Sequence, residues 1–139
     1  MTKKEAIERL RSVPLFEGLT TKDLQNIYSS CKEGYFEEGR DVVVEGRGGI
    51  GLHLILDGKA VVKQRSRKVA TLKRGDYFGE ISLIDGGDRT ATVTAETDLT
   101  TLSISSWSFK PLMEKPSIAK ALMVKLCARI RELEKDPTH

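Results

Sequence analysis

The chain has 139 residues, of which 39% are hydrophobic and 31% are charged. This balance is typical of a globular domain with its own core, and it excludes a disordered chain. The 23 basic and 20 acidic residues leave a formal net charge of +3, which by itself is too small to indicate a nucleic-acid partner. The first ten residues contain no apolar signal region, and no apolar run reaches the length of a membrane span. We therefore expect a cytoplasmic protein with no membrane partner.

Two short helices are predicted within residues 1–33. The first has three apolar residues on one face and ends at Pro14. The second has Thr20 and Thr21 as its N-terminal cap and ends before Gly34. The apolar positions are Ala6, Ile7 and Leu10 in the first helix, and Leu24, Ile27 and Tyr28 in the second.

Over residues 34–105 the pattern of apolar residues changes from a helical period to a period of two. Short alternating or β-branched runs are separated by turn residues about every ten positions, and the basic segment "RSRK" at 65–68 lies between two of them as a hairpin tip. This spacing predicts a small barrel or jelly-roll sandwich. The runs are 41–46, 51–58, 59–64, 68–75, 89–97 and 99–105.

The helical period returns over residues 106–135. A short helix closes near Pro116, and a longer one follows with Ser117 as its cap. The longer helix carries an apolar stripe that is able to pack on the barrel, act as a lid or pair with a second subunit, and we rank packing on the barrel first. The stripe consists of Ile118, Leu122, Leu126, Ile130 and Leu133. The fold class is therefore mainly β with flanking helices, and we expect one domain over residues 1–139.

The sequence lacks the combinations of residues that common catalytic sites need. Cys31 and Cys127 are far apart, and their helical contexts predict two buried reduced thiols. Metal-dependent jelly-roll enzymes need several His and carboxylate ligands, and His53 is the only histidine before the C-terminal residue. His53 also has no evident nucleophile as a partner, and no P-loop is present. We expect no enzymatic activity and no metal.

The stretch "GDYFGEISLIDGGDRTATV", residues 75–93, combines glycines with one Glu and one Arg in apolar surroundings. A helix beginning at Gly79 would direct N–H groups of its first turn toward an anion. The guanidinium of Arg89 fits a phosphate, and the carboxylate of Glu80 accepts from a hydroxyl. A cyclic nucleotide offers one phosphate and one free ribose hydroxyl, the 2′-OH. From spacing alone, an ordinary ion pair between Glu80 and Arg89 remains the more common arrangement.

This stretch closely resembles the phosphate-binding cassette of the cyclic-nucleotide-binding domain family, through its F-G-E-x-S-L and R-T-A motifs. The resemblance extends over essentially the whole chain. The segment 13–27 resembles the family's helical entry, 39–62 its first barrel strands, and 109–134 its last two helices. The resemblance implies a jelly-roll barrel with N-terminal helices and a C-terminal helical lid.

The resemblance also implies roles for individual residues. Glu80 would take the ribose 2′-OH, and Arg89 the cyclic phosphate. Gly79, Ile81 and Ser82 would contribute N–H groups, and Thr90 and Ala91 would contact the phosphate and the purine edge. The full set of expected ligand-binding residues is Phe78, Gly79, Glu80, Ile81, Ser82, Arg89, Thr90 and Ala91. The lid candidates are Leu126, Arg129, Ile130 and Leu133.

Three positions depart from the commonest family pattern. Ile50 stands where an acidic residue is frequent and His53 where an aromatic one is common, and we expect both to be structural. Thr90 stands where many cyclic-AMP binders have Ala, and its hydroxyl could bond the 2-amino group of a syn guanine. Cyclic AMP (cAMP) is favoured as the ligand, and cyclic GMP (cGMP) is left open. No cofactor is expected.

The leading hypothesis is a regulatory sensor whose C-terminal helix changes position on binding and signals to an effector protein or a fused domain. The alternative is a protein-interaction domain with the same fold that has lost the nucleotide. No helix-turn-helix pattern follows the last helix, and the "RSRK" segment is best explained as a solvated turn, so no nucleic-acid partner is expected. A dimer through the C-terminal helix is an arrangement that the stripe allows.

Overall fold

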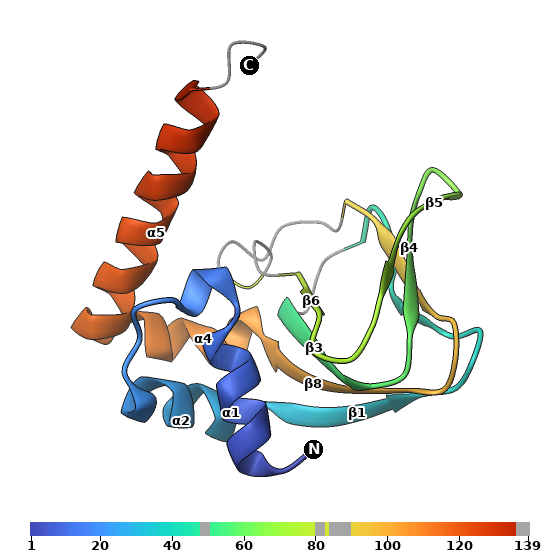
Figure 1. The fold of residues 1–139 in the computed structure, drawn as a ribbon, viewed down its shortest axis with the longest axis horizontal. Coiled ribbons are helices and arrows are strands. Elements are labelled where there is room, and N and C mark those ends of the chain that lie inside the picture. Colours follow the sequence, from blue (N-terminus) through green and yellow to red (C-terminus); the bar gives the residue numbers. More distant parts are fainter. Residues whose placement is uncertain (48–50, 80–82, 84–89, 136–139) are drawn as a thin grey trace.

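The computed structural model of the chain describes residues 1–47, 51–79, 83 and 90–135, and the structural statements below concern these residues. Ile50, for which a structural role was expected, lies outside them. A helical layer covers one side of a β barrel, as Figure 1 shows. The helices are α1 (Lys3–Arg11), the 3₁₀ turn η1 (Pro14–Phe16), α2 (Thr21–Ser29), α4 (Ser106–Met113) and α5 (Pro116–Lys135). The strands are β1 (Lys32–Phe36), β2 (Asp41–Val43), β3 (Gly51–Asp57), β4 (Ala60–Gln64), β5 (Arg67–Leu72), β6 (Tyr77–Phe78), β7 (Thr92–Ala95) and β8 (Leu99–Ser105).

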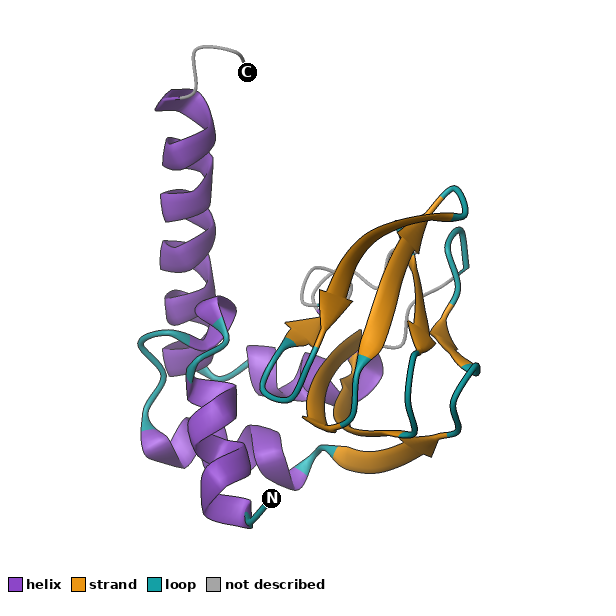
Figure 2. Ribbon diagram, turned by 45° about the vertical axis from the view of Figure 1, so that its right-hand side comes forward, coloured by secondary structure: helices purple, strands orange, loops and turns teal. Residues whose placement is uncertain are grey.

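The strands form two antiparallel sheets of four, in the orders β1-β8-β3-β6 and β2-β7-β4-β5. Figure 2 shows the two sheets closing on each other, with the helices gathered at one side. The predicted fold class, a jelly-roll barrel with flanking helices, is confirmed. The first strand begins at Lys32 rather than at residue 34, because Lys32 already pairs with Ser103 of β8.

Strand β3 lies between two hydrophobic clusters. Leu52, Leu54 and Leu56 belong to a cluster that includes residues of the helices, whereas Ile55 belongs to the cluster between the sheets. The side chains of a strand alternate between its faces, so β3 is covered on both sides. Every residue of β3 except Asp57 is buried.

The caps of the helices agree only in part with the sequence. Thr20 caps α2 as predicted, because its Oγ1 accepts from the N–H of Asp23 and the Asp23 carboxylate accepts from the N–H of Thr20. The predicted cap of α5 is wrong. The helix begins at Pro116, whose fixed φ suits a first helical position, and Ser117 lies inside it.

The predicted hairpin at the basic segment is confirmed. Strands β4 and β5 pair up to Gln64 and Arg67, so Arg65 and Ser66 form a two-residue turn. Their φ angles are 51° and 66°, which match the positive φ values that a type I′ turn requires at both central positions.

The two cysteines differ from each other in burial. Cys31 is half-buried after α2, and burial raises the pKa of its thiol to about 12. The prediction of a buried Cys127 is wrong, because this residue lies on the exposed side of α5.

Within the described part of the chain, no helix is both long and apolar enough to cross a membrane.

Candidate functional site

The site predicted from the sequence begins where β6 leaves the barrel. Strand β6 pairs with β3, which places Phe78 opposite His53. The two rings stack with centroids 4.9 Å apart and planes 9° apart, and His53 is buried. Both residues thus support the wall of the barrel, as expected for His53, and Phe78 brings the chain to the edge of the site.

Gly79 follows Phe78 with a φ of +88°. This backbone conformation is accessible to glycine and costly for residues with a Cβ. The Gly79 carbonyl accepts a hydrogen bond of 3.1 Å from the N–H of Leu83, and this i to i−4 bond is of the kind that closes an α-helical turn. Leu83 is fully buried in the cluster that includes the helices, so both described ends of this segment are fixed in place.

Four of the predicted ligand-binding residues lie outside the described residues. They are Glu80, Ile81, Ser82 and Arg89. Their roles toward a ribose hydroxyl and a phosphate remain predictions.

The far end of the site is Thr90, which leads through Ala91 into β7. Thr90 is exposed and Ala91 is half-buried. The Thr90 carbonyl accepts a hydrogen bond of 3.3 Å from Nε2 of Gln64, at the end of β4. Thr90 and Gln64 both line a cavity of about 750 Å³ at the β4–β5 hairpin.

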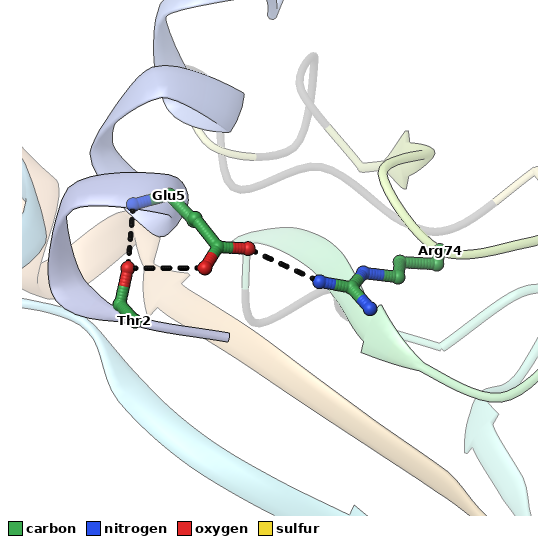
Figure 3. A network of polar contacts seen from close by, with 3 residues as sticks. All are labelled: Thr2, Glu5 and Arg74. Carbon is green, nitrogen blue, oxygen red and sulfur yellow. Dashed lines mark hydrogen bonds and ion pairs between the residues drawn. The ribbon is translucent and has the colours of Figure 1, made fainter.

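Helix α1 contacts the turn that leads into β6. Oε2 of Glu5 lies 3.2 Å from Nη2 of Arg74, and Thr2 caps the helix through a 3.1 Å bond from the N–H of Glu5 (Figure 3). Both side chains of the ion pair are about half exposed, so the pair orients the turn more than it stabilises the fold. The turn is also bonded to β3, because the N–H of Gly75 donates to the Ile55 carbonyl over 2.9 Å.

Two polar contacts between described residues join helix α5 to the N-terminal part of the chain, one to α2 and one to Glu17 after η1. The hydroxyl of Ser117 donates to Oδ1 of Asp23 over 3.2 Å. Nζ of Lys125 lies 2.5 Å from Oε2 of Glu17, and this hydrogen bond and the ammonium charge lower the pKa of the Glu17 carboxyl. Sequence inspection could not find this second pair, because 108 positions separate its members and neither lies in a motif.

The apolar stripe of α5 is buried only in its first part. Ile118 and Leu122 are buried against the helical layer, whereas Leu126, Ile130 and Leu133 are 38%, 55% and 55% exposed. In Figures 1 and 2 the later turns of α5 extend away from the barrel. The ranking that placed the whole stripe on the barrel is therefore wrong, because the helix continues past the surfaces that cover its first turns.

One lid candidate does approach the strand that leads to the site. Arg129 lines a cavity of about 340 Å³ together with Tyr77 of β6, Pro14, Leu15 and Lys125. Tyr77 was not a predicted site residue. The alternation of side chains along the two-residue strand β6 is too short to predict that Tyr77 faces α5. The lid roles of Leu126, Arg129, Ile130 and Leu133 remain predictions.

Among the residues placed by the structure, no cluster of three or more His, Cys, Asp or Glu could hold a metal ion.

Comparison with known proteins identifies the family to which this fold belongs. The sequence model described as "Cyclic nucleotide-binding domain" matches residues 33–116, which include the barrel, the cassette and α4. The chain belongs to this family. The solved N-terminal domain of a transcriptional regulator from Streptomyces coelicolor A3(2) aligns with a TM-score of 0.83 and 29% identity, over 90% of this chain and 94% of that one.

Curated relatives of this family member include two kinds of kinase protein. The cAMP-dependent protein kinase regulatory subunit of Eremothecium gossypii is 37% identical over 105 residues, which are 75% of this chain and 23% of that protein. The cGMP-dependent protein kinase of Eimeria tenella is 38% identical over 95 residues, which are 68% of this chain and 10% of that protein. The chain thus spans less than a quarter of the length of either relative.

We predict that Gly79→Ala destabilises the fold by about 1–2 kcal/mol, because alanine at a φ of +88° brings its Cβ too close to the backbone. Urea denaturation measures the change. Gly34→Ala is the matched control, since a Cβ there would meet its nearest atom at an ordinary 3.5 Å, and it should be neutral or slightly stabilising. Equal free energies of unfolding for the two variants would contradict the prediction.

Proposed function

We propose that this domain is a non-catalytic sensor of a cyclic mononucleotide. Arg89 pairs with the cyclic phosphate, Glu80 accepts from the ribose 2′-OH, and N–H groups from Gly79 to Ser82 complete the phosphate site. The guanidinium supplies a planar fork of donors, and the carboxylate supplies only acceptors, so the two groups recognise different parts of one ligand.

The position of the F-G-E and R-T-A motifs in the fold carries this proposal. Gly79 has its left-handed φ at the end of β6, and Thr90 lies at the start of the chain that enters β7. Both lie within the segment that matches the family. A motif gains its meaning from such a context, and the same residues in an unrelated loop would not support a nucleotide site.

We infer that the base is adenine, because several relatives are cAMP-dependent protein kinase regulatory subunits, and Thr90 makes guanine the second candidate. The relatives include a cAMP-dependent kinase subunit and a cGMP-dependent kinase, so the family match alone leaves both bases open. Thr90 is exposed at the cavity and carries a hydroxyl that could meet a guanine amino group. The alanine found there in many cAMP binders would lack that donor and acceptor.

The sensor works by a shift between two positions of α5. Its first turns are fixed by Ile118, Leu122 and the Ser117–Asp23 bond, and its later turns are exposed. A ligand that binds better to the state with α5 closed over the base will populate that state. The stripe then changes its accessibility to an effector protein or to a further domain.

We predict that cAMP binds in titration calorimetry and that linear 5′-AMP does not compete. Arg89→Ala should weaken binding by about 1.5–3 kcal/mol, the contribution of a hydrogen bond to a charged group, which corresponds to roughly 10- to 150-fold in Kd. Arg40→Ala is the control, because it removes an exposed arginine outside the cassette. Absence of heat and of thermal stabilisation with both cyclic nucleotides would favour the alternative, a protein-interaction domain without a ligand.

The same titration with 2′-deoxy-cAMP tests Glu80. The wild type should bind cAMP more tightly than the deoxy ligand, and Glu80→Ala should abolish this preference. The variant lacks the acceptor and the deoxy ligand lacks the hydroxyl of the same predicted hydrogen bond, so removing either one removes the whole contact. A preference that persists in Glu80→Ala would assign the 2′-OH to another group.

We predict that nucleotide binding changes the distance between α4 and α5. The chain has one tryptophan, Trp107 on α4, which serves as a fluorescence donor. An acceptor dye attaches selectively to the exposed Cys127 on α5, because the raised pKa of Cys31, about 12, keeps that thiol protonated. Energy transfer should change saturably with cAMP and remain constant in Arg89→Ala. A constant transfer efficiency in the nucleotide-bound wild type would refute the movement.

We also predict that two copies associate through α5 at high concentration. The exposed residues Met123, Leu126, Ile130 and Leu133 are spaced by three and four positions, as in the seam of a coiled coil. Ile130→Asn should weaken the dimer in sedimentation equilibrium, whereas Ala128→Asn, outside this seam, should not. A wild type that sediments as a monomer at all concentrations would exclude this interface.

A further inference from the structure

The basic segment 65–68 lies next to the candidate nucleotide site. The cavity of about 750 Å³ that contains Thr90 is also lined by Arg65, Arg67 and Lys68. The sequence predicts a solvated hairpin tip, and the exposure of all four residues of the segment agrees with this prediction. The structure also brings three cationic side chains to the rim of a cavity that includes a predicted ligand-binding residue.

Three hydrogen bonds fix the hairpin tip beside the end of the cassette. Nε2 of Gln64 donates to the Thr90 carbonyl over 3.3 Å. The N–H of Arg65 donates to Oε1 of Glu45 over 3.1 Å, and the N–H of Glu45 donates to Oγ1 of Thr92 over 2.9 Å. The tip, the end of β2 and the start of β7 are thus joined, so the cations stay close to Thr90.

The turn geometry does not explain why a cation stands at the tip. Arg65 and Ser66 have φ angles of 51° and 66°, and Asn and Gly adopt such angles at lower cost. An Asn-Gly pair would form the same hairpin more favourably. The presence of arginine at the first of these positions is therefore better explained by its charge.

The charge of the cavity rim suits an anionic ligand. Among the described residues that line the cavity, three are cationic and one is a carboxylate, Glu45, which already accepts the N–H of Arg65. A cleft lined by charges of one sign raises the local concentration of an oppositely charged ligand and accelerates its association. A cyclic nucleotide carries one negative charge on its phosphate, so such a rim would attract it.

We propose that Arg65, Arg67 and Lys68 form a cationic rim that steers the anionic cyclic nucleotide into its site and sets the rate of capture. The inference rests on the proposed function and adds to it a role for residues outside the cassette. The rim acts before the ligand is bound, so it changes the association rate constant and leaves the dissociation rate constant almost unchanged.

Stopped-flow fluorescence with a fluorescent cAMP analogue tests the rim. The variant with Arg65→Gln, Arg67→Gln and Lys68→Gln should lower the association rate constant by about 3- to 10-fold at low salt. The control variant with Lys4→Gln, Lys22→Gln and Lys110→Gln removes the same charge from exposed positions on α1, α2 and α4, and should change this rate by less than about twofold. All six residues are exposed, so both variants should melt at the temperature of the wild type.

Salt dependence of the wild type gives a second measurement that needs no variant. Raising the ionic strength from about 0.01 M to about 1 M shortens the Debye length from about 30 Å to about 3 Å. The wild-type association rate should fall over this range, and the rates of the wild type and the rim variant should converge.

Four results would overturn the inference. Equal association rates of the rim and control variants would remove the role of the rim, while binding by the wild type would leave the proposed function intact. A slower association in the rim variant that persists at high salt, or a change only in dissociation, would replace steering by direct contact. A wild type that binds neither the analogue nor unlabelled cAMP would reject the proposed function, and the inference with it.

Discussion

Strand β3 is buried along both faces, and the positions of the other elements depend on this packing. Its leucines contact the cluster that includes the helices, and Ile55 contacts the cluster between the sheets. A strand covered on both sides has its register fixed, because a slip of one residue would exchange the two sets of side chains. Strand β6 pairs with β3, so the start of the cassette takes its position from the most buried of the described strands.

The two described ends of the candidate site both rest on the barrel. At one end, the stacked rings of His53 and Phe78 support the wall of the barrel directly before Gly79. At the other end, Gln64 and the neighbouring hairpin support Thr90. Functional groups are positioned precisely only when a scaffold fixes the chain on either side of them, and the barrel fixes both described ends of the candidate site.

Helix α5 has a different character, because only its first part shares the core. Ile118 and Leu122 contribute apolar burial, and Asp23 and Glu17 each bind one polar side chain of the helix. Beyond Lys125 the large apolar side chains are exposed. A helix that is fixed at one end and exposes apolar surface at the other can change its contacts without disrupting the core.

The chain by itself determined the class of fold and the family. Helical and alternating periods, the Thr20 cap and the F-G-E and R-T-A motifs are local patterns, and local patterns depend only on neighbouring residues. The predicted cap at Ser117 and the predicted burial of Cys127 are wrong because both rest on local patterns. The start of α5 and the exposure of its later turns depend on distant residues. The Lys125–Glu17 pair and the approach of the hairpin cations to Thr90 join segments far apart in the sequence, and no local period encodes such distances. Tertiary structure alone decided these contacts, because only the packed fold brings these distant segments together.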